Sequence, residues 1–100
     1  MIIESNTTEY ELVRECLKER FPEIDVVIAI SDPALKKLGF SDEVPCTFEI
    51  MATDDEIEEI FEFAMDLEAE VYMSENPEKD PLYQENKKWE MVYNILSYWA

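Results

Sequence analysis

The sequence contains no histidine and a single glycine, Gly39. The absence of histidine removes the commonest general base and the commonest ligand for transition metals. One glycine is too few for a glycine-rich phosphate loop, a dinucleotide-binding fingerprint or the calcium loop of an EF-hand. Lysine and carboxylate chemistry stay open, but no nucleophile–base pair can be recognised. The sequence therefore predicts a non-enzymatic protein with no cofactor and no dedicated metal site.

Cysteine is also scarce, and Cys16 and Cys46 match no metal-binding or redox spacing. We expect two reduced thiols in the core, with a disulfide or a reactive thiol as the alternatives. The chain shows no basic n-region of a signal peptide, and its longest apolar run, residues 26–30, is far too short to span a bilayer. These features predict a cytoplasmic protein that does not enter membranes.

Basic residues are also scarce: the chain has eight Lys and Arg against 25 Asp and Glu, which gives a net charge of −17. Residues 54–80 hold a large share of the acids and one base, Lys79. Such a surface repels nucleic acid and anionic membranes and attracts basic surfaces. Because 47% of the residues are apolar, we expect a folded single domain over residues 1–100 and not a disordered acidic tail.

Helix-capping and helix-breaking residues in the sequence predict four helices. The first runs from the polar residues 6–8 to about Arg20, and a short one runs from residues 31–33 to Gly39. The capping-box sequence at residues 53–56 opens a third helix that reaches about Met73. Asp80 and Pro81 precede a last helix that continues nearly to the C-terminal residue.

Two main strands are expected. Residues 25–30 form an unbroken, mostly β-branched run, typical of a strand covered on both faces. Residues 44–51 alternate between apolar and polar, and residues 1–4 offer an edge strand. Parallel and antiparallel pairing of the two main strands fit equally well. The expected fold class is α+β: a small two- or three-stranded sheet with three main helices and one short helix, packed mostly on one face.

The helix that opens at Thr53 has two opposite faces at 100° per residue. Its apolar face consists of Ile57, Ile60, Phe61, Ala64, Leu67 and Val71. An ordinary surface helix intersperses lysines among its acids, which relieves repulsion between like charges four residues apart, but residues 54–73 contain none. We therefore take the opposite, acidic face as the candidate partner-binding surface: Asp55, Glu58, Glu59, Glu62, Asp66 and Glu70.

Glu68 is an exception, since the same wheel places it inside the apolar stripe, between Ala64 and Val71. We expect it at the margin of the core, either reaching solvent or paired with Arg14 or Arg20; a buried functional carboxylate is the alternative. The acids at residues 54–59 are suited to weak binding of a hard cation. They face outward around a helix start, however, so no dedicated metal site is expected.

The last predicted helix is rich in aromatic residues. Its expected core stripe is Trp89, Val92, Tyr93, Leu96 and Trp99. A second band, Met91, Ile95 and Tyr98, runs toward the opposite side. Either several neighbours bury this band, or it is exposed together with Trp99 as a second interface, because Tyr, Trp and Met are common at interfaces. That interface would serve a homodimer or another partner.

The acidic face predicts a partner with a basic surface and argues against direct binding of nucleic acid. Its carboxylates recur about every 4.5 to 6 Å, comparable to the phosphates of a nucleic-acid strand. The favoured function is an inhibitor or nucleic-acid mimic that docks on a nucleic-acid-processing protein. The alternatives are an immunity or antitoxin-like protein that neutralises a basic toxin, and a homodimeric adaptor that uses the C-terminal aromatic helix. In general character, though not in any motif, the chain resembles the small acidic inhibitors of phages and mobile elements, including DNA mimics and anti-CRISPR proteins.

Overall fold

The computed structural model describes residues 1–30 and 45–100. The short helix expected from residues 31–33 to Gly39 lies outside the described residues. The chain divides into two compact units. The sheet unit comprises Met1–Ala52 and Trp99–Ala100, and the hairpin unit comprises Thr53–Tyr98. The expectation that residues 1–100 form one domain stays a prediction.

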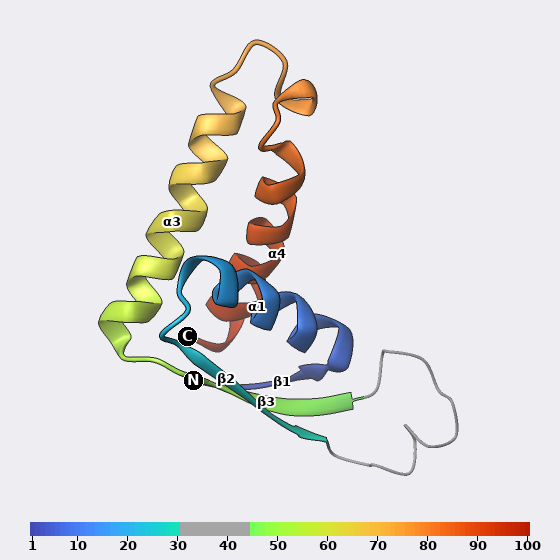
Figure 1. The fold of residues 1–100 in the computed structure, drawn as a ribbon, viewed down its shortest axis with the longest axis vertical. Coiled ribbons are helices and arrows are strands. Elements are labelled where there is room, and N and C mark those ends of the chain that lie inside the picture. Colours follow the sequence, from blue (N-terminus) through green and yellow to red (C-terminus); the bar gives the residue numbers. More distant parts are fainter. Residues whose placement is uncertain (31–44) are drawn as a thin grey trace. The chain divides into compact units, whose positions relative to one another are not determined.

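The sheet unit contains three strands in the spatial order β1-β3-β2 (Figure 1). They are β1 (Ile2–Asn6), β2 (Asp25–Ile30) and β3 (Pro45–Met51). Both neighbours of the central strand β3 are antiparallel to it, and Ile3 and Ile28 both lie opposite Phe48. Antiparallel pairing is thus the correct one of the two expected arrangements. The edge strand expected at residues 1–4 is confirmed as β1.

Helix α1 (Thr7–Arg20) follows β1 without a loop because Asn6 serves both elements. Asn6 ends the strand in an extended conformation, and its side-chain oxygen accepts a hydrogen bond from the Glu9 backbone N–H at 2.8 Å. This is the usual way in which a helix start satisfies a backbone donor. The helix ends where Phe21 donates its N–H to the Leu17 carbonyl at 2.6 Å and Pro22 follows.

Helix α1 covers one face of the sheet and builds the core of this unit. Ile3, Cys46, Phe48 and Ile50 are buried, and strand alternation and register place them on one face of the sheet. The Tyr10 ring of α1 meets the Phe48 ring at a centroid distance of 5.6 Å, close to edge-on. Cys46 and Cys16 are both buried and not joined in a disulfide, as expected. Burial raises the pKa of the Cys46 thiol, and the Glu9 carboxylate adds to the rise, so this thiol is poorly suited to nucleophilic chemistry.

The prediction that residues 25–30 are covered on both faces was wrong. Strand β2 lies at an edge of the sheet, and its Val27 and Ala29 are exposed, while Val26 and Ile28 are half-buried. An unbroken apolar run therefore arose here in an antiparallel edge strand and not in the interior of a parallel sheet. The outer face of the sheet also leaves Ile2 and Met51 exposed.

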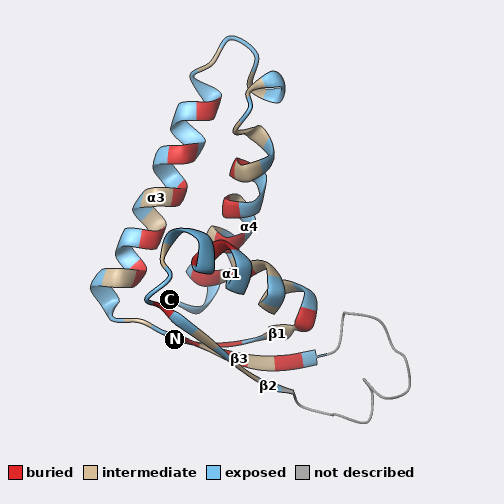
Figure 2. Ribbon diagram, viewed as in Figure 1, coloured by how far each residue is buried: buried red, intermediate tan, exposed pale blue. Residues whose placement is uncertain are grey.

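The hairpin unit consists of two antiparallel helices joined by a turn (Figure 1). Helix α3 (Asp54–Tyr72) leads to the 3-10 turn η1 (Pro77–Lys79), and helix α4 (Tyr83–Trp99) returns alongside α3. The buried residues of the two helices lie on the sides that face each other (Figure 2). Two edge-to-face ring pairs join them: Phe61 with Tyr93 at 5.2 Å and Phe63 with Trp89 at 4.7 Å.

The last helix begins slightly later than its expected caps. The Asp80 side chain accepts the Leu82 N–H at 2.9 Å, and the Asp80 carbonyl accepts the Tyr83 N–H at 3.0 Å. These bonds form a turn, and helical geometry starts at Tyr83. Asp80 therefore acts through a turn of the kind that Asp commonly makes before a helix.

Together, residues 1–30 and 45–100 form an α+β fold with a three-stranded antiparallel sheet, three helices and one 3-10 turn. The predicted fold class is confirmed. None of these three helices is both long enough and apolar enough to cross a membrane.

Candidate functional site

Helix α3 carries the candidate site, and its start is fixed by the predicted capping box. The Glu56 backbone N–H donates to the Thr53 hydroxyl at 3.2 Å, and the Thr53 N–H donates to the Glu56 carboxylate at 3.0 Å. Asp54, Asp55 and Glu56 also place negative charge at the positive end of the helix dipole. The first turn is thus held by hydrogen bonds and by charge, so the helix presents its faces from its first residues onward.

The rotation of α3 about its axis is set by its contact with α4. Five apolar side chains are buried: Ile57, Ile60, Ala64, Leu67 and Val71. Phe61 and Phe63 flank this stripe on its two sides and hold it through their ring contacts with α4. Because burial and ring contacts agree, the opposite face of α3 is turned away from α4.

The six predicted carboxylates are all exposed on that opposite face: Asp55, Glu58, Glu59, Glu62, Asp66 and Glu70. They come from five successive turns of one helix that contains no Lys or Arg. An ion pair between Lys87 and Glu90, at 3.9 Å, lies on α4. The acidic face therefore presents charge that no base on its own helix offsets.

Glu68 agrees with the expectation that it lies at the margin of the core and reaches solvent. Its side chain is exposed. The buried stripe runs through Ile57, Ala64 and Leu67 and does not extend to this margin of the helix. Glu68 thus adds to the charge of α3 and gives no sign of a special environment.

The residues of the second predicted interface, on α4, differ in their exposure to solvent. Met91 is 52% exposed, Tyr98 is more exposed still, and Ile95 is half-buried. Met91 and Tyr98 are two helical turns apart and share one face. Trp89, Val92 and Leu96 are buried as expected, but Trp99 is exposed and groups with the sheet unit. Placing Trp99 in the core stripe was therefore wrong, because the helix ends at this residue.

Sequence reasoning missed a third set of side chains, on α3 and at its C-cap residue Met73. Met65, Tyr72 and Met73 are large, apolar and exposed. Their signal in the sequence is heptad spacing: Met65 follows Glu58 by seven residues and Glu62 by three, and Tyr72 follows Met65 by seven. That spacing places Met65 and Tyr72 on the same side of the helix as part of the acidic face.

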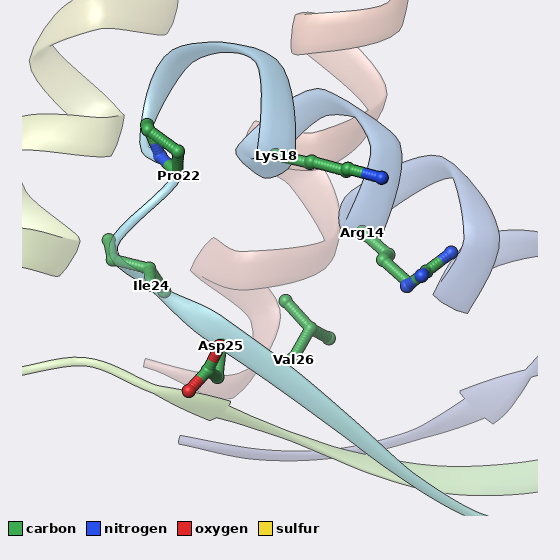
Figure 3. A pocket seen from close by; sticks show the side chains of 6 residues that line it. All are labelled: Arg14, Lys18, Pro22, Ile24, Asp25 and Val26. Carbon is green, nitrogen blue, oxygen red and sulfur yellow. The ribbon is translucent and has the colours of Figure 1, made fainter.

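One hollow of about 350 Å³ lies in the sheet unit, between α1 and β2. It is lined by Arg14, Lys18, Pro22, Ile24, Asp25 and Val26. In Figure 3 the nitrogen atoms of Arg14 and Lys18 point away from the Asp25 carboxylate. The lining contains two cations and one carboxylate, and because the Lys18 nitrogen is turned away from Asp25 it does not bring a nucleophile and a base together.

No group of three or more Asp, Glu, Cys or His side chains in the described part of the chain is arranged to hold a metal ion. Comparison with protein-family models, curated proteins and solved structures finds no match to this chain. The candidate site therefore rests on the geometry and charge of helix α3.

Proposed function

We propose that this chain is a cytoplasmic, non-enzymatic inhibitor that docks the acidic face of α3 on the basic surface of a nucleic-acid-processing protein. The observation that carries the proposal is the set of six exposed carboxylates on a helix without a single base. Like charges four residues apart on a helix destabilise it by a few tenths of a kcal/mol per pair. A functional partner with bases would convert that repulsion into attraction.

The charge also explains how such a partner would be selected. A concentrated negative face accelerates encounter with a positive surface and suppresses encounter with acidic surfaces. Surfaces that bind nucleic acid are rich in Lys and Arg, because they neutralise phosphates. A rigid row of carboxylates about 4.5 to 6 Å apart along the helix suits such a surface.

The proposal is tested with the protein immobilised as an affinity matrix for an extract of its native host at low salt. The wild type should retain nucleic-acid-binding proteins, release them in a salt gradient and release them when duplex DNA is added as a competitor. The variant Glu59→Lys/Glu62→Lys/Asp66→Lys should retain none of them. A matched control, Glu11→Lys/Glu15→Lys/Glu19→Lys, changes three exposed acids of α1 by the same charge and should behave as the wild type.

Equal retention by the wild type and the α3 variant would contradict the proposal. Partners that elute with salt but resist duplex DNA would favour the immunity-like alternative, since a toxin need not use its nucleic-acid site. Circular dichroism of both triple variants shows whether each remains folded.

A homodimeric adaptor is supported by the exposure of Met91 and Tyr98 on one face of α4. Sedimentation equilibrium distinguishes it from the inhibitor. A dimer that dissociates on Met91→Ser would support the adaptor function, and a monomer at high protein concentration would contradict it.

A further inference from the structure

The outer side of α3 carries a second regular seam in addition to the one that contacts α4. Its members recur at alternating spacings of three and four residues, which is the heptad spacing of helices that pack along one another. All of its members are exposed, and Met65 and Tyr72 retain 48% and 50% of their surface. We call this set the outer seam: Asp55, Glu58, Glu62, Met65, Ala69 and Tyr72.

The inner seam of the same helix shows what this spacing does in the protein. Its residues, Ile57, Ile60, Ala64, Leu67 and Val71, follow the same alternation and are buried in the hairpin. One helix thus carries two heptad faces, of which the inner one already has α4 as its neighbour (Figure 2). The outer seam extends over about 25 Å of helix, long enough for a second helix to follow it.

The outer seam has two chemically different halves. Asp55, Glu58 and Glu62 form a carboxylate half at the start of α3, and Met65, Ala69 and Tyr72 form an apolar half toward its end. The small Ala69 between two large side chains leaves room for a side chain from a neighbour. Near the apolar half, Lys87 of α4 lies 5.3 Å from the centroid of the Tyr83 ring. Asp66, Glu68 and Glu70 flank the apolar half, so what distinguishes it from the carboxylate half is its exposed apolar surface and not a lack of negative charge.

We infer that the outer seam docks an amphipathic helix of the protein partner, which places apolar side chains on Met65, Ala69 and Tyr72 and Lys or Arg side chains on Asp55, Glu58 and Glu62. Recognition of a helix through anchors at this spacing is a common mode of binding. The inference rests on the proposed function in one respect: it takes from that proposal that the partner is basic. It adds the partner's secondary structure and an apolar contact that a nucleic-acid mimic acting through charge alone does not need.

A second copy of this chain does not fit the outer seam. A parallel pair of seams would place carboxylate half against carboxylate half, and an antiparallel pair would place carboxylates against Met65 and Tyr72. The first arrangement is repulsive, and the second removes charges from water without a partner. A basic and apolar helix meets neither obstacle. We expect it to run antiparallel to α3, because its bases then lie near its own C-terminus, where the helix dipole favours cations.

The probes are two synthetic helical peptides of about three heptads. Both carry lysines at the contact positions of their C-terminal half. The amphipathic peptide has leucines at the contact positions of its N-terminal half, and the polar peptide has serines there. Fluorescence anisotropy should show that the protein binds the amphipathic peptide at least about tenfold more tightly than the polar peptide. This difference in affinity is what one pair of buried apolar contacts would give. The preference should persist at high salt, because salt does not screen apolar contact.

The location of the contact is tested with Met65→Ser/Tyr72→Ser, which should bind both peptides equally. The matched control is Met51→Ser/Met91→Ser, whose residues are 54% and 52% exposed and lie outside the seam. It should keep the preference. Equal binding of the two peptides by the wild type, or an unchanged preference in Met65→Ser/Tyr72→Ser, would overturn the inference.

Failure of the proposed function gives a different result in the same assay. If charge plays no part, Glu59→Lys/Glu62→Lys/Asp66→Lys binds both peptides as tightly as the wild type does. If charge acts but the helix-docking inference is wrong, this triple variant loses both peptides while the wild type binds them equally.

Discussion

The side chain of Asn86 is 1% exposed on the buried side of α4, and neither its amide nitrogen nor its oxygen has a hydrogen-bond partner in the described structure. A buried polar group without a partner destabilises a fold by about 1–3 kcal/mol. Its neighbours along the same side of the helix, Trp89 and Val92, are buried and apolar. At the scale of single residues, Asn86 is thus a buried position whose hydrogen-bonding groups are left unsatisfied.

Replacing this side chain with an apolar one should stabilise the protein. We expect Asn86→Leu to raise the free energy of unfolding by about 1–3 kcal/mol, because it removes two unpaired polar atoms and adds apolar contact. Urea unfolding followed by circular dichroism measures the change. Asn94→Leu, at an exposed site of the same helix, should change it by less than about 0.5 kcal/mol. A destabilised Asn86→Leu variant would show that the amide is required for packing.

At the scale of elements, the start of α3 depends on one reciprocal pair, Thr53 and Glu56. Thr53→Ala leaves the Glu56 backbone N–H without its acceptor, so we expect the free energy of unfolding to fall by about 1 kcal/mol. Thermal unfolding gives the measurement. Thr8→Ala, an exposed threonine inside the first turn of α1, should have no comparable effect. If both variants lost the same free energy of unfolding, the effect would come from removing a threonine side chain and not from removing the helix cap.

The elements that sequence predicts best are those with a local physical signal. The capping box at Thr53, the alternation of Cys46, Phe48 and Ile50, and the acidic and apolar faces of α3 each depend on neighbours a few residues apart. The pairing of β1 with β3 does not, since it joins residues that are 39 to 47 positions apart in the chain. The exposure of Met65 and Tyr72 likewise depends on where α4 lies, which the sequence of α3 does not encode. The sequence thus indicated the exposed carboxylates of the candidate site but not the exposure of Met65 and Tyr72.

At the scale of the whole molecule, a net charge of −17 on 100 residues destabilises the folded state, because like charges repel one another. Raising NaCl from about 0.01 M to 1 M shortens the screening length from about 30 Å to about 3 Å. We expect the melting temperature to rise by about 5 °C or more, which corresponds to about 1 kcal/mol for a domain of this size. Calorimetry at both salt concentrations tests this.

The charge-reversed variants provide the control for this prediction. Glu59→Lys/Glu62→Lys/Asp66→Lys carries less negative charge and should gain less from salt than the wild type does. A melting temperature that falls with NaCl, or rises equally in both proteins, would show that repulsion on α3 is not the term being screened.

The central position of β3 has a consequence for the order in which the chain acquires structure. Strands β1 and β2 both pair with β3 and not with each other. A ribosome that has made only the first thirty residues has therefore produced two strands without the strand that they share. Helix α1 can form at that time, but its apolar face has no completed sheet to cover. The three-stranded sheet can form only after Met51 has left the ribosome, and the acidic helix α3 is the next segment to emerge.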